Sequence, residues 1–196
     1  MIGLDFDNTL VDYAEAFRAE AAKFELGGAS TKTEIRDRLR LRHGGEIVWQ
    51  KLQARVYGPG IKHARLMNGA RAFLDECIRR EVPLAIVSHK SRYAAQDPGG
   101  VDLRQAAREW LAHQDLGIAH DNVFFEETRE AKLGRIRSLE CRYFVDDLTE
   151  VLLDPRFPPS TQRLWLTASL ETPPPPIDAA GDWSRIAHFV FAPRLL

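Results

Sequence analysis

The chain has 196 residues, of which 44% are hydrophobic and 28% charged, and its 27 basic and 28 acidic residues give a formal net charge of −1. This length is enough for one well-buried core and a small appendage. The near-neutral charge argues against a nucleic-acid polymer or a membrane surface as a general partner. No apolar stretch approaches the roughly 20 residues needed to cross a bilayer.

Cysteine usage and the start of the chain indicate a cytoplasmic protein. The first predicted strand begins at residue 2, so we expect no signal peptide. Cys77 and Cys141 are far apart and lack the spacing of metal ligands. We therefore expect two small buried thiols rather than a disulfide.

Five short apolar runs have the character of buried strands, because they are β-branched or aromatic and are bounded by polar or turn residues. They cover residues 2–6, 83–88, 122–126, 142–146 and 162–166. Helical patterns follow over 69–81, 102–116, 132–140 and 182–190. Strands that alternate with helices predict an α/β fold with a doubly wound parallel sheet, covered by helices on both faces.

The segment between the first two strands is longer than one crossover requires. It spans about 75 residues, whereas a strand–helix–strand unit needs roughly 30. The surplus, residues 12–68, contains helix-like segments at 12–25, 31–42 and 45–57. We therefore predict a core formed by 1–11 and 69–196, and a small all-helical cap formed by 12–68.

Two carboxylates lie at the carboxyl end of the first predicted strand, in the sequence Asp5-Phe6-Asp7-Asn8-Thr9. Side chains two positions apart in a strand lie on the same face, so Asp5 and Asp7 are expected to point together from its carboxyl end. Like charges at this distance repel unless a cation lies between them. Mg²⁺ favours such oxygen ligands together with phosphate oxygens. The pair therefore indicates phosphoryl transfer through an aspartyl-phosphate.

Three further polar features come at or just after the ends of successive predicted strands: Ser88, Lys132 and Asp146-Asp147. Each has an ordinary structural interpretation, as a turn residue, a solvated helix lysine and a helix N-cap respectively. Ligands of parallel α/β sheets bind beyond the carboxyl ends of the strands. The order of the features along the chain therefore favours a common site.

This set of motifs resembles that of the haloacid dehalogenase-like (HAD) superfamily, over nearly the whole chain. The stretch from Asp5 to Thr9 is similar to the first motif of that superfamily, Ser88 to the second, Lys132 to the third and Asp146-Asp147 to the fourth. Many members carry a helical cap at the position of the long insertion. The resemblance implies a Rossmann-like core and chemistry that depends on Mg²⁺.

The resemblance also implies a role for each residue. Asp5 would be the nucleophile, and Asp7 would protonate the leaving oxygen and then activate water. Ser88 and Lys132 would hold the phosphoryl group and the nucleophile.

A metal site is implied by the same resemblance. Mg²⁺ would bind the carboxylate of Asp5, the backbone carbonyl of Asp7 and one member of the acidic pair Asp146-Asp147. Asp147 is expected to be the direct ligand and Asp146 the water-mediated one.

We expect a phosphomonoester hydrolase, because members with other chemistries resemble this pattern but replace the second acid, here Asp7. A phosphomutase and a catalytically silent HAD-like binding protein are the alternatives. A signalling receiver domain is disfavoured because the third strand ends in Glu126-Glu127-Thr128 and because receivers lack a long helical insertion. A dinucleotide-binding protein is disfavoured because no G-x-G-x-x-G follows the first strand.

The expected substrate is a small phosphorylated metabolite, such as a sugar phosphate or a nucleotide. Residues 12–68 hold 11 basic and 7 acidic residues, and this cap could form a positive lid over an anion. The arginines at 36, 38, 40 and 42 instead fan around a helix, which favours a solvated face. The polar residues that follow the second strand are open to both interpretations: His89, Lys90, Arg92 and Tyr93.

Overall fold

The computed structural model describes residues 1–24, 26, 28, 31–97, 100–168 and 173–192. The predicted helix 12–25 ends at residue 25, outside the described residues. The chain divides into two compact units. Unit 1 comprises Met1–Leu10, Leu66–His89 and Leu116–Leu196, and unit 2 comprises Val11–Arg65 and Lys90–Asp115. Within the described ranges, no helix has both the length and the apolar character that a membrane crossing requires.

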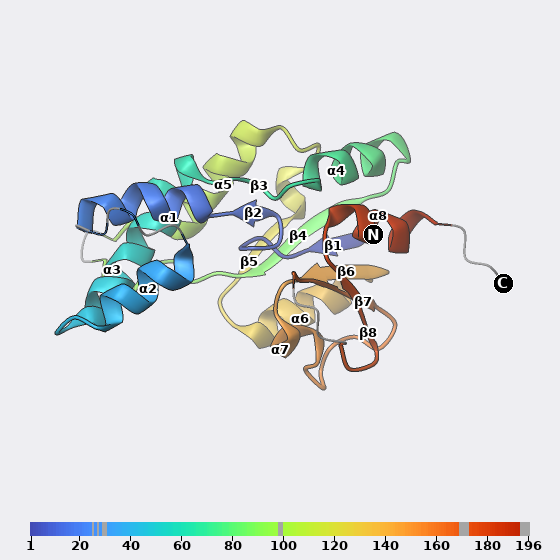
Figure 1. Cartoon of the computed structure of the whole chain (residues 1–196). Coiled ribbons are helices and arrows are strands. Elements are labelled where there is room, and N and C mark those ends of the chain that lie inside the picture. Colours follow the sequence, from blue (N-terminus) through green and yellow to red (C-terminus); the bar gives the residue numbers. More distant parts are fainter. Residues whose placement is uncertain (25, 27, 29–30, 98–99, 169–172, 193–196) are drawn as a thin grey trace. The chain divides into compact units, whose positions relative to one another are not determined.

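Unit 1 contains a six-stranded sheet in the order β5-β4-β1-β6-β7-β8, and every neighbouring pair is parallel (Figure 1). The strand β1 is short and contains Gly3. The ring of Phe144 packs closely against this glycine, because a Cβ on residue 3 would lie only 2.5 Å from the ring. The strands are β1 (Ile2–Leu4), β4 (Leu84–His89), β5 (Val123–Glu126), β6 (Tyr143–Asp146), β7 (Gln162–Leu166) and β8 (Ile177–Ala180).

Helices cover both faces of this sheet, which confirms the predicted doubly wound α/β fold. On one face, α6 (Arg129–Ser138) and α7 (Thr149–Leu152) bury a cluster that includes Val87 and Phe144. On the other face lie α4 (Ala70–Arg79) and α8 (Trp183–Phe191) (Figure 1). A short 3₁₀ turn, η3 (His120–Asn122), precedes β5. Cys77 and Cys141 are free and buried, as predicted.

Helix α6 begins at Arg129, three residues before the predicted start. Thr128 is its N-cap, and the Thr128 side chain accepts a hydrogen bond from the Ala131 amide at 3.1 Å. A threonine in this position satisfies one of the amide groups that a first helical turn leaves without an intrahelical partner. Lys132 consequently lies within the first turns of α6 rather than at its first residue.

Unit 2 is built mainly from helices around an aromatic core. Phe17 and Trp49 stack with their ring centroids 5.5 Å apart, and Tyr13 meets Tyr57 edge to face at 4.9 Å. Two short strands, β2 (Val11–Asp12) and β3 (Arg65–Leu66), form a separate two-stranded sheet. The helical elements are α1 (Ala14–Ala21), η1 (Ala22–Phe24), α2 (Lys32–Arg40), α3 (Gly45–Tyr57), η2 (Pro59–His63) and α5 (Leu103–Gln114).

Residues 90–115 belong to unit 2 although they follow a strand of the sheet. Trp110 of α5 is 5% exposed and donates its indole N–H to the Ala64 carbonyl at 3.2 Å, which joins α5 to the end of the long insertion. The compact units therefore differ from the predicted division over this segment. The domain boundaries at 11, 12, 68 and 69 stay a prediction.

Candidate active site

The first acidic residue of the site is fixed by strand pairing. Leu4, the last residue of β1, pairs with Ile86 of β4 and with Val145 of β6. The Asp5 amide then donates to the Val145 carbonyl at 2.9 Å, so β1 and β6 stay joined one residue further. Asp5 and Asp146 each come directly after one of these paired residues, and therefore leave the sheet at the same edge.

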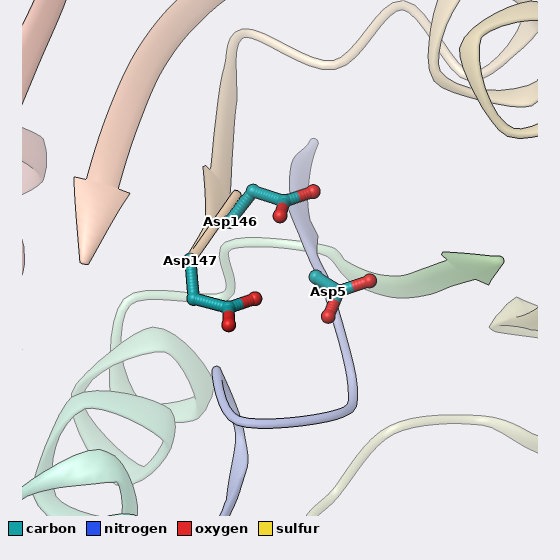
Figure 2. Close-up of side chains that lie close together, drawn as sticks. All are labelled: Asp5, Asp146 and Asp147. Atoms are coloured by element: carbon teal, nitrogen blue, oxygen red, sulfur yellow. The ribbon is translucent and has the colours of Figure 1, made fainter. Parts of the chain in front are cut away.

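Three carboxylates meet at this edge (Figure 2). Asp5, Asp146 and Asp147 each offer an oxygen, and these oxygens lie within 4.8 Å of one another. The residues Asp5 and Asp146 are 5% and 0% exposed, whereas Asp147 is half-buried. Water therefore has least access to the first two, and Asp147 forms the more open side of the cluster.

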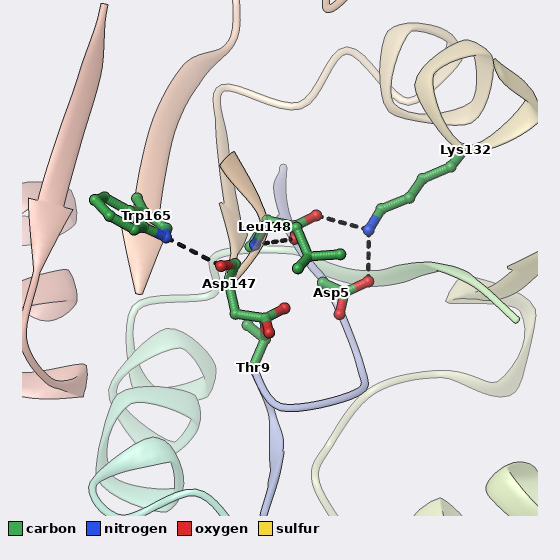
Figure 3. Close-up of polar contacts among 7 residues, drawn as sticks. Asp5, Thr9, Lys132, Asp147, Leu148 and Trp165 are labelled. Carbon is green, nitrogen blue, oxygen red and sulfur yellow. Dashed lines mark hydrogen bonds and ion pairs between the residues drawn. The ribbon is translucent and has the colours of Figure 1, made fainter. Parts of the chain in front are cut away.

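Lys132 reaches into this cluster from α6 (Figure 3). Its amino group donates to Asp5 Oδ1 at 2.5 Å and to Asp146 Oδ2 at 2.6 Å. The lysine is 2% exposed, so both ion pairs are shielded from water. A buried charge is tolerated where opposite charges and hydrogen bonds compensate it, and here each of the three groups has such a partner.

Burial sets the protonation of the carboxyl groups. It raises the pKa of Asp5 to about 6, against the opposing effect of Lys132, and it also raises the pKa of Asp146. Burial and the charge of Asp5 raise the pKa of Asp147 to about 6. Burial alone would lower the pKa of Lys132, but Asp5 and Asp146 outweigh it and raise that pKa above its ordinary value. The lysine is thus a permanent cation beside acids that resist ionisation.

The two members of the acidic pair have different surroundings. Asp146 uses both oxygens, because Oδ2 accepts from Lys132 and Oδ1 accepts from the Leu148 amide at 2.9 Å. Asp147 Oδ1 accepts a longer hydrogen bond, at 3.3 Å, from the Thr9 hydroxyl. Asp147 is therefore better placed than Asp146 to give an oxygen to an added ligand.

The structure also places the remaining predicted site residues, Asp7 and Ser88. Asp7 is half-buried two residues after Asp5, and its charge contributes to the raised pKa of Asp5. It is not part of the three-carboxylate group. Ser88 is 1% exposed near the end of β4, two residues beyond the Ile86 that pairs with β1. Lys132 thus contacts Asp5 and Asp146 directly, and Asp147 offers an oxygen within 4.8 Å of theirs. Asp7 follows Asp5 along the chain, and Ser88 lies on the adjacent strand β4.

Other contacts at the site were not predicted from the sequence. Thr9 was part of the quoted motif but received no role, and it is fully buried against Asp147. Trp165, at the end of β7, donates its indole N–H to the Asp147 carbonyl at 3.0 Å (Figure 3). The sequence signal for Trp165 is a tryptophan, whose indole N–H can donate a hydrogen bond, near the carboxyl end of a predicted strand.

The donor set fits a hard divalent cation. All three clustered side chains are carboxylates, which are the ligands that Mg²⁺ prefers. Three carboxylates and one lysine would carry a net negative charge in a site that burial makes unfavourable for anions. A cation would relieve this repulsion and would favour the ionised forms of Asp5 and Asp147, whose pKa values are raised chiefly by burial.

Comparison with solved structures identifies the architecture. A haloacid dehalogenase-like family hydrolase from Streptococcus pneumoniae superimposes with a TM-score of 0.59 at 17% identity, over 96% of this chain and 97% of that one. The chain has a HAD-like fold. The predicted resemblance is therefore confirmed for the fold, although no protein-family model and no curated protein matches the sequence.

Other structures with the HAD-like fold carry different descriptions. A predicted phosphoglycolate phosphatase from Haemophilus somnus matches with a TM-score of 0.54 at 14% identity, over 97% of each chain. Protein tyrosine kinase A of Mycobacterium tuberculosis matches with a TM-score of 0.62 at 15% identity, also over 97% of each chain. Because a kinase and hydrolases share the HAD-like fold, the reaction must be argued from the residues of the site.

Proposed function

We propose that this chain is a Mg²⁺-dependent phosphomonoester hydrolase that acts on a small phosphorylated metabolite through an aspartyl-phosphate. One observation carries the proposal. Lys132 joins Asp5 and Asp146 in a buried cluster to which Asp147 also belongs, although these residues are far apart in sequence. The predicted phosphatases among the structures of the same fold support it further.

The first half-reaction forms the covalent intermediate. A carboxylate oxygen of Asp5 attacks phosphorus, and the bond from phosphorus to the leaving oxygen breaks. Asp7 gives its proton to that oxygen, so the product leaves as a neutral alcohol. Lys132 stabilises Asp5 in its ionised, nucleophilic form by the 2.5 Å hydrogen bond, against the burial that raises its pKa.

The second half-reaction returns the chain to its starting state. Asp7, now ionised, takes a proton from a water molecule as that water attacks phosphorus. The bond between phosphorus and the Asp5 oxygen breaks, and inorganic phosphate is released. The separation of Asp7 from the three-carboxylate group supports this acid–base role, because a side chain committed to a metal could not exchange protons freely.

Bound Mg²⁺ would be held by the Asp5 and Asp147 carboxylates and the Asp7 carbonyl, and would neutralise the negative charge of the transferring group. Both oxygens of Asp146 already accept hydrogen bonds, which supports the assignment of Asp147 as the direct ligand. Ser88, buried at the end of β4, would donate its hydroxyl to a phosphoryl oxygen.

The test is hydrolysis of a generic aryl phosphate by the purified chain with and without Mg²⁺. We expect turnover only with the metal, and its loss in Asp5→Asn, which keeps the size of the side chain and removes the nucleophile. Asp75→Asn, which alters an exposed acid on α4, is the matched control and should behave as the unaltered chain. Full activity in Asp5→Asn would refute the nucleophile.

A panel of sugar phosphates and nucleotides, read by release of inorganic phosphate, would define the substrate class. The same panel separates the alternatives. A phosphomutase would convert a phosphorylated sugar into its isomer without releasing phosphate. A catalytically silent relative would bind Mg²⁺ and substrate but turn over neither the aryl phosphate nor any member of the panel.

A further inference from the structure

Two tryptophans each donate a hydrogen bond to the backbone of a loop that carries the acids of the site. Trp165 of β7 donates from Nε1 to the Asp147 carbonyl at 3.0 Å, and Trp183 of α8 donates from Nε1 to the Thr9 carbonyl at 3.3 Å. Both indoles are buried, at 9% and 1% exposure. The two acceptors lie in the segments 5–9 and 146–148, which we call the two acid loops.

We propose that Trp165 and Trp183 are positioning residues that hold the two acid loops at the separation needed to bind a divalent cation. The inference rests on the proposed function for the identity of the ion. It assigns to these indoles a role that neither the sequence motifs nor the resemblance includes.

The need for such a clamp follows from the charges. Asp5 and Asp147 offer oxygens that lie within 4.8 Å of each other, so the two carboxylates repel one another when both are ionised. Without a metal ion this repulsion tends to move Asp147 away from Asp5. The amino group of Lys132 bridges the side chains of Asp5 and Asp146, whereas Asp147 is joined to the first loop through a longer hydrogen bond, 3.3 Å, from the Thr9 hydroxyl, which is a weak restraint. The indoles restrain both backbones from outside the cluster.

The indole is well suited to this position. The two acceptor residues, Thr9 and Asp147, lie beyond the ends of β1 and β6. A buried carbonyl needs a donor, and the indole N–H donates without offering a lone pair. It therefore satisfies the carbonyl and does not itself compete for the cation.

Each indole is fixed by its own surroundings. Trp165 pairs in register with Asp146 and belongs to the buried cluster under α6 and α7. Trp183 packs against Phe73 of α4 with ring centroids 5.0 Å apart. Gly69 precedes α4 with a φ of +83°, and a Cβ there would lie 3.2 Å from the Cβ of Trp183. Packing on one face of the sheet therefore holds Trp165, and packing on the other face holds Trp183.

The test compares three tryptophan-to-phenylalanine variants. Trp165→Phe and Trp183→Phe keep an aromatic ring and remove the N–H donor. Trp110→Phe is the matched control, because Trp110 is also a buried indole that donates to a backbone carbonyl, that of Ala64 in unit 2. Replacement of Trp165 by β-(3-benzothienyl)alanine, which keeps the shape of the indole and lacks the N–H, serves if the phenylalanine variant does not fold.

Two readouts that do not depend on turnover are measured well below the unfolding temperature of every variant. The first is the Mg²⁺ dissociation constant from calorimetry. The second is hydrogen exchange of the Leu148 amide in metal-free protein, because this amide donates to Asp146 within the second acid loop. We expect about 10-fold weaker Mg²⁺ binding, as for other residues that orient metal ligands, and faster exchange at Leu148 for Trp165→Phe. Trp183→Phe should weaken Mg²⁺ binding in the same way.

The outcomes separate this inference from the proposed function. If Trp165→Phe and Trp183→Phe match Trp110→Phe in both readouts, the clamp is overturned and the tryptophans only pack. If the unaltered chain binds no Mg²⁺, the proposed function fails. Exchange at Leu148 in the metal-free protein still decides whether the acid loops are clamped.

Discussion

At the scale of single residues, the site depends on one buried cation. Lys132 compensates two carboxylates that are themselves almost inaccessible to water. Removing charged groups from water costs several kcal/mol per ion, and close ion pairs with good geometry offset that cost. One lysine cannot neutralise three carboxylates, so the remaining negative charge makes the metal-free site sensitive to pH.

The pKa of about 6 for Asp5 and Asp147 predicts the direction of that sensitivity. Both pKa values exceed the unfolded value, so the folded metal-free chain binds more protons than the unfolded chain between about pH 4 and pH 6. This contribution to stability is present below that window and is lost as the pH rises through it. Above pH 6, Mg²⁺ replaces the protons, so we expect it to stabilise the chain more at pH 7 than at pH 5.

Denaturant unfolding at pH 5 and pH 7, with and without Mg²⁺, measures this effect. A variant carrying Asp5→Asn and Asp147→Asn should lose the pH-dependent part of the stabilisation. Glu76 and Asp154, whose arginine neighbours lower the pKa of each to about 2, also contribute to the pH dependence of stability, but this contribution is the same with and without Mg²⁺ and cancels in the comparison. Equal stabilisation by Mg²⁺ at both pH values would contradict the assignment of these acids to a metal site.

At the scale of elements, the N-terminus of α6 determines where Lys132 lies. The Lys132 amide donates a hydrogen bond to the Thr128 carbonyl at 3.0 Å, and the Thr128 hydroxyl accepts one from the Ala131 amide in the same turn. Loss of an N-cap hydroxyl typically costs about 1 kcal/mol. We expect Thr128→Ala to destabilise the chain by about this amount. We also expect kcat to fall while KM changes little, because the helical turn that carries Lys132 would fray.

The chain contains a matched control for this prediction. Thr31 caps α2 in unit 2 in the same way, accepting from the Glu34 amide at 3.1 Å. Thr31→Ala should cost a similar free energy of unfolding and leave kcat unchanged. Steady-state kinetics and denaturant unfolding of the two variants provide the comparison. A Thr128→Ala variant that loses stability but keeps full kcat would show that the cap does not serve the site.

The elements were predictable to different extents. Buried parallel strands are continuous apolar runs, so 162–166 was predicted with the bounds that β7 has. The strand β8 was missed because Ile177-Asp178-Ala179-Ala180 has no run of β-branched or aromatic residues. The pattern of α5 indicates a buried face, but it cannot say what covers that face, so its grouping with unit 2 was not predictable.

At the scale of the whole molecule, the order of the motifs predicted a common site, and the resemblance implied that Lys132 holds Asp5, but the other contacts of the site were not predicted. Asp5 and Lys132 are 127 residues apart, and only the parallel sheet explains why strand ends so distant in sequence share one edge. The contacts of Trp165 and Trp183 could not be predicted, because their acceptors are backbone carbonyls, which every residue possesses. Long-range contacts of this kind depend on the completed fold.

The most direct test is a crystal structure of the chain grown with Mn²⁺ as an anomalous-scattering substitute for Mg²⁺. We predict one anomalous peak bound by Asp5 and Asp147, at the distances of about 2.0–2.2 Å typical of such oxygen ligands, with Lys132 still bonded to Asp5. A peak elsewhere, or an Asp147 carboxylate turned away from Asp5 in the presence of the metal, would contradict the account.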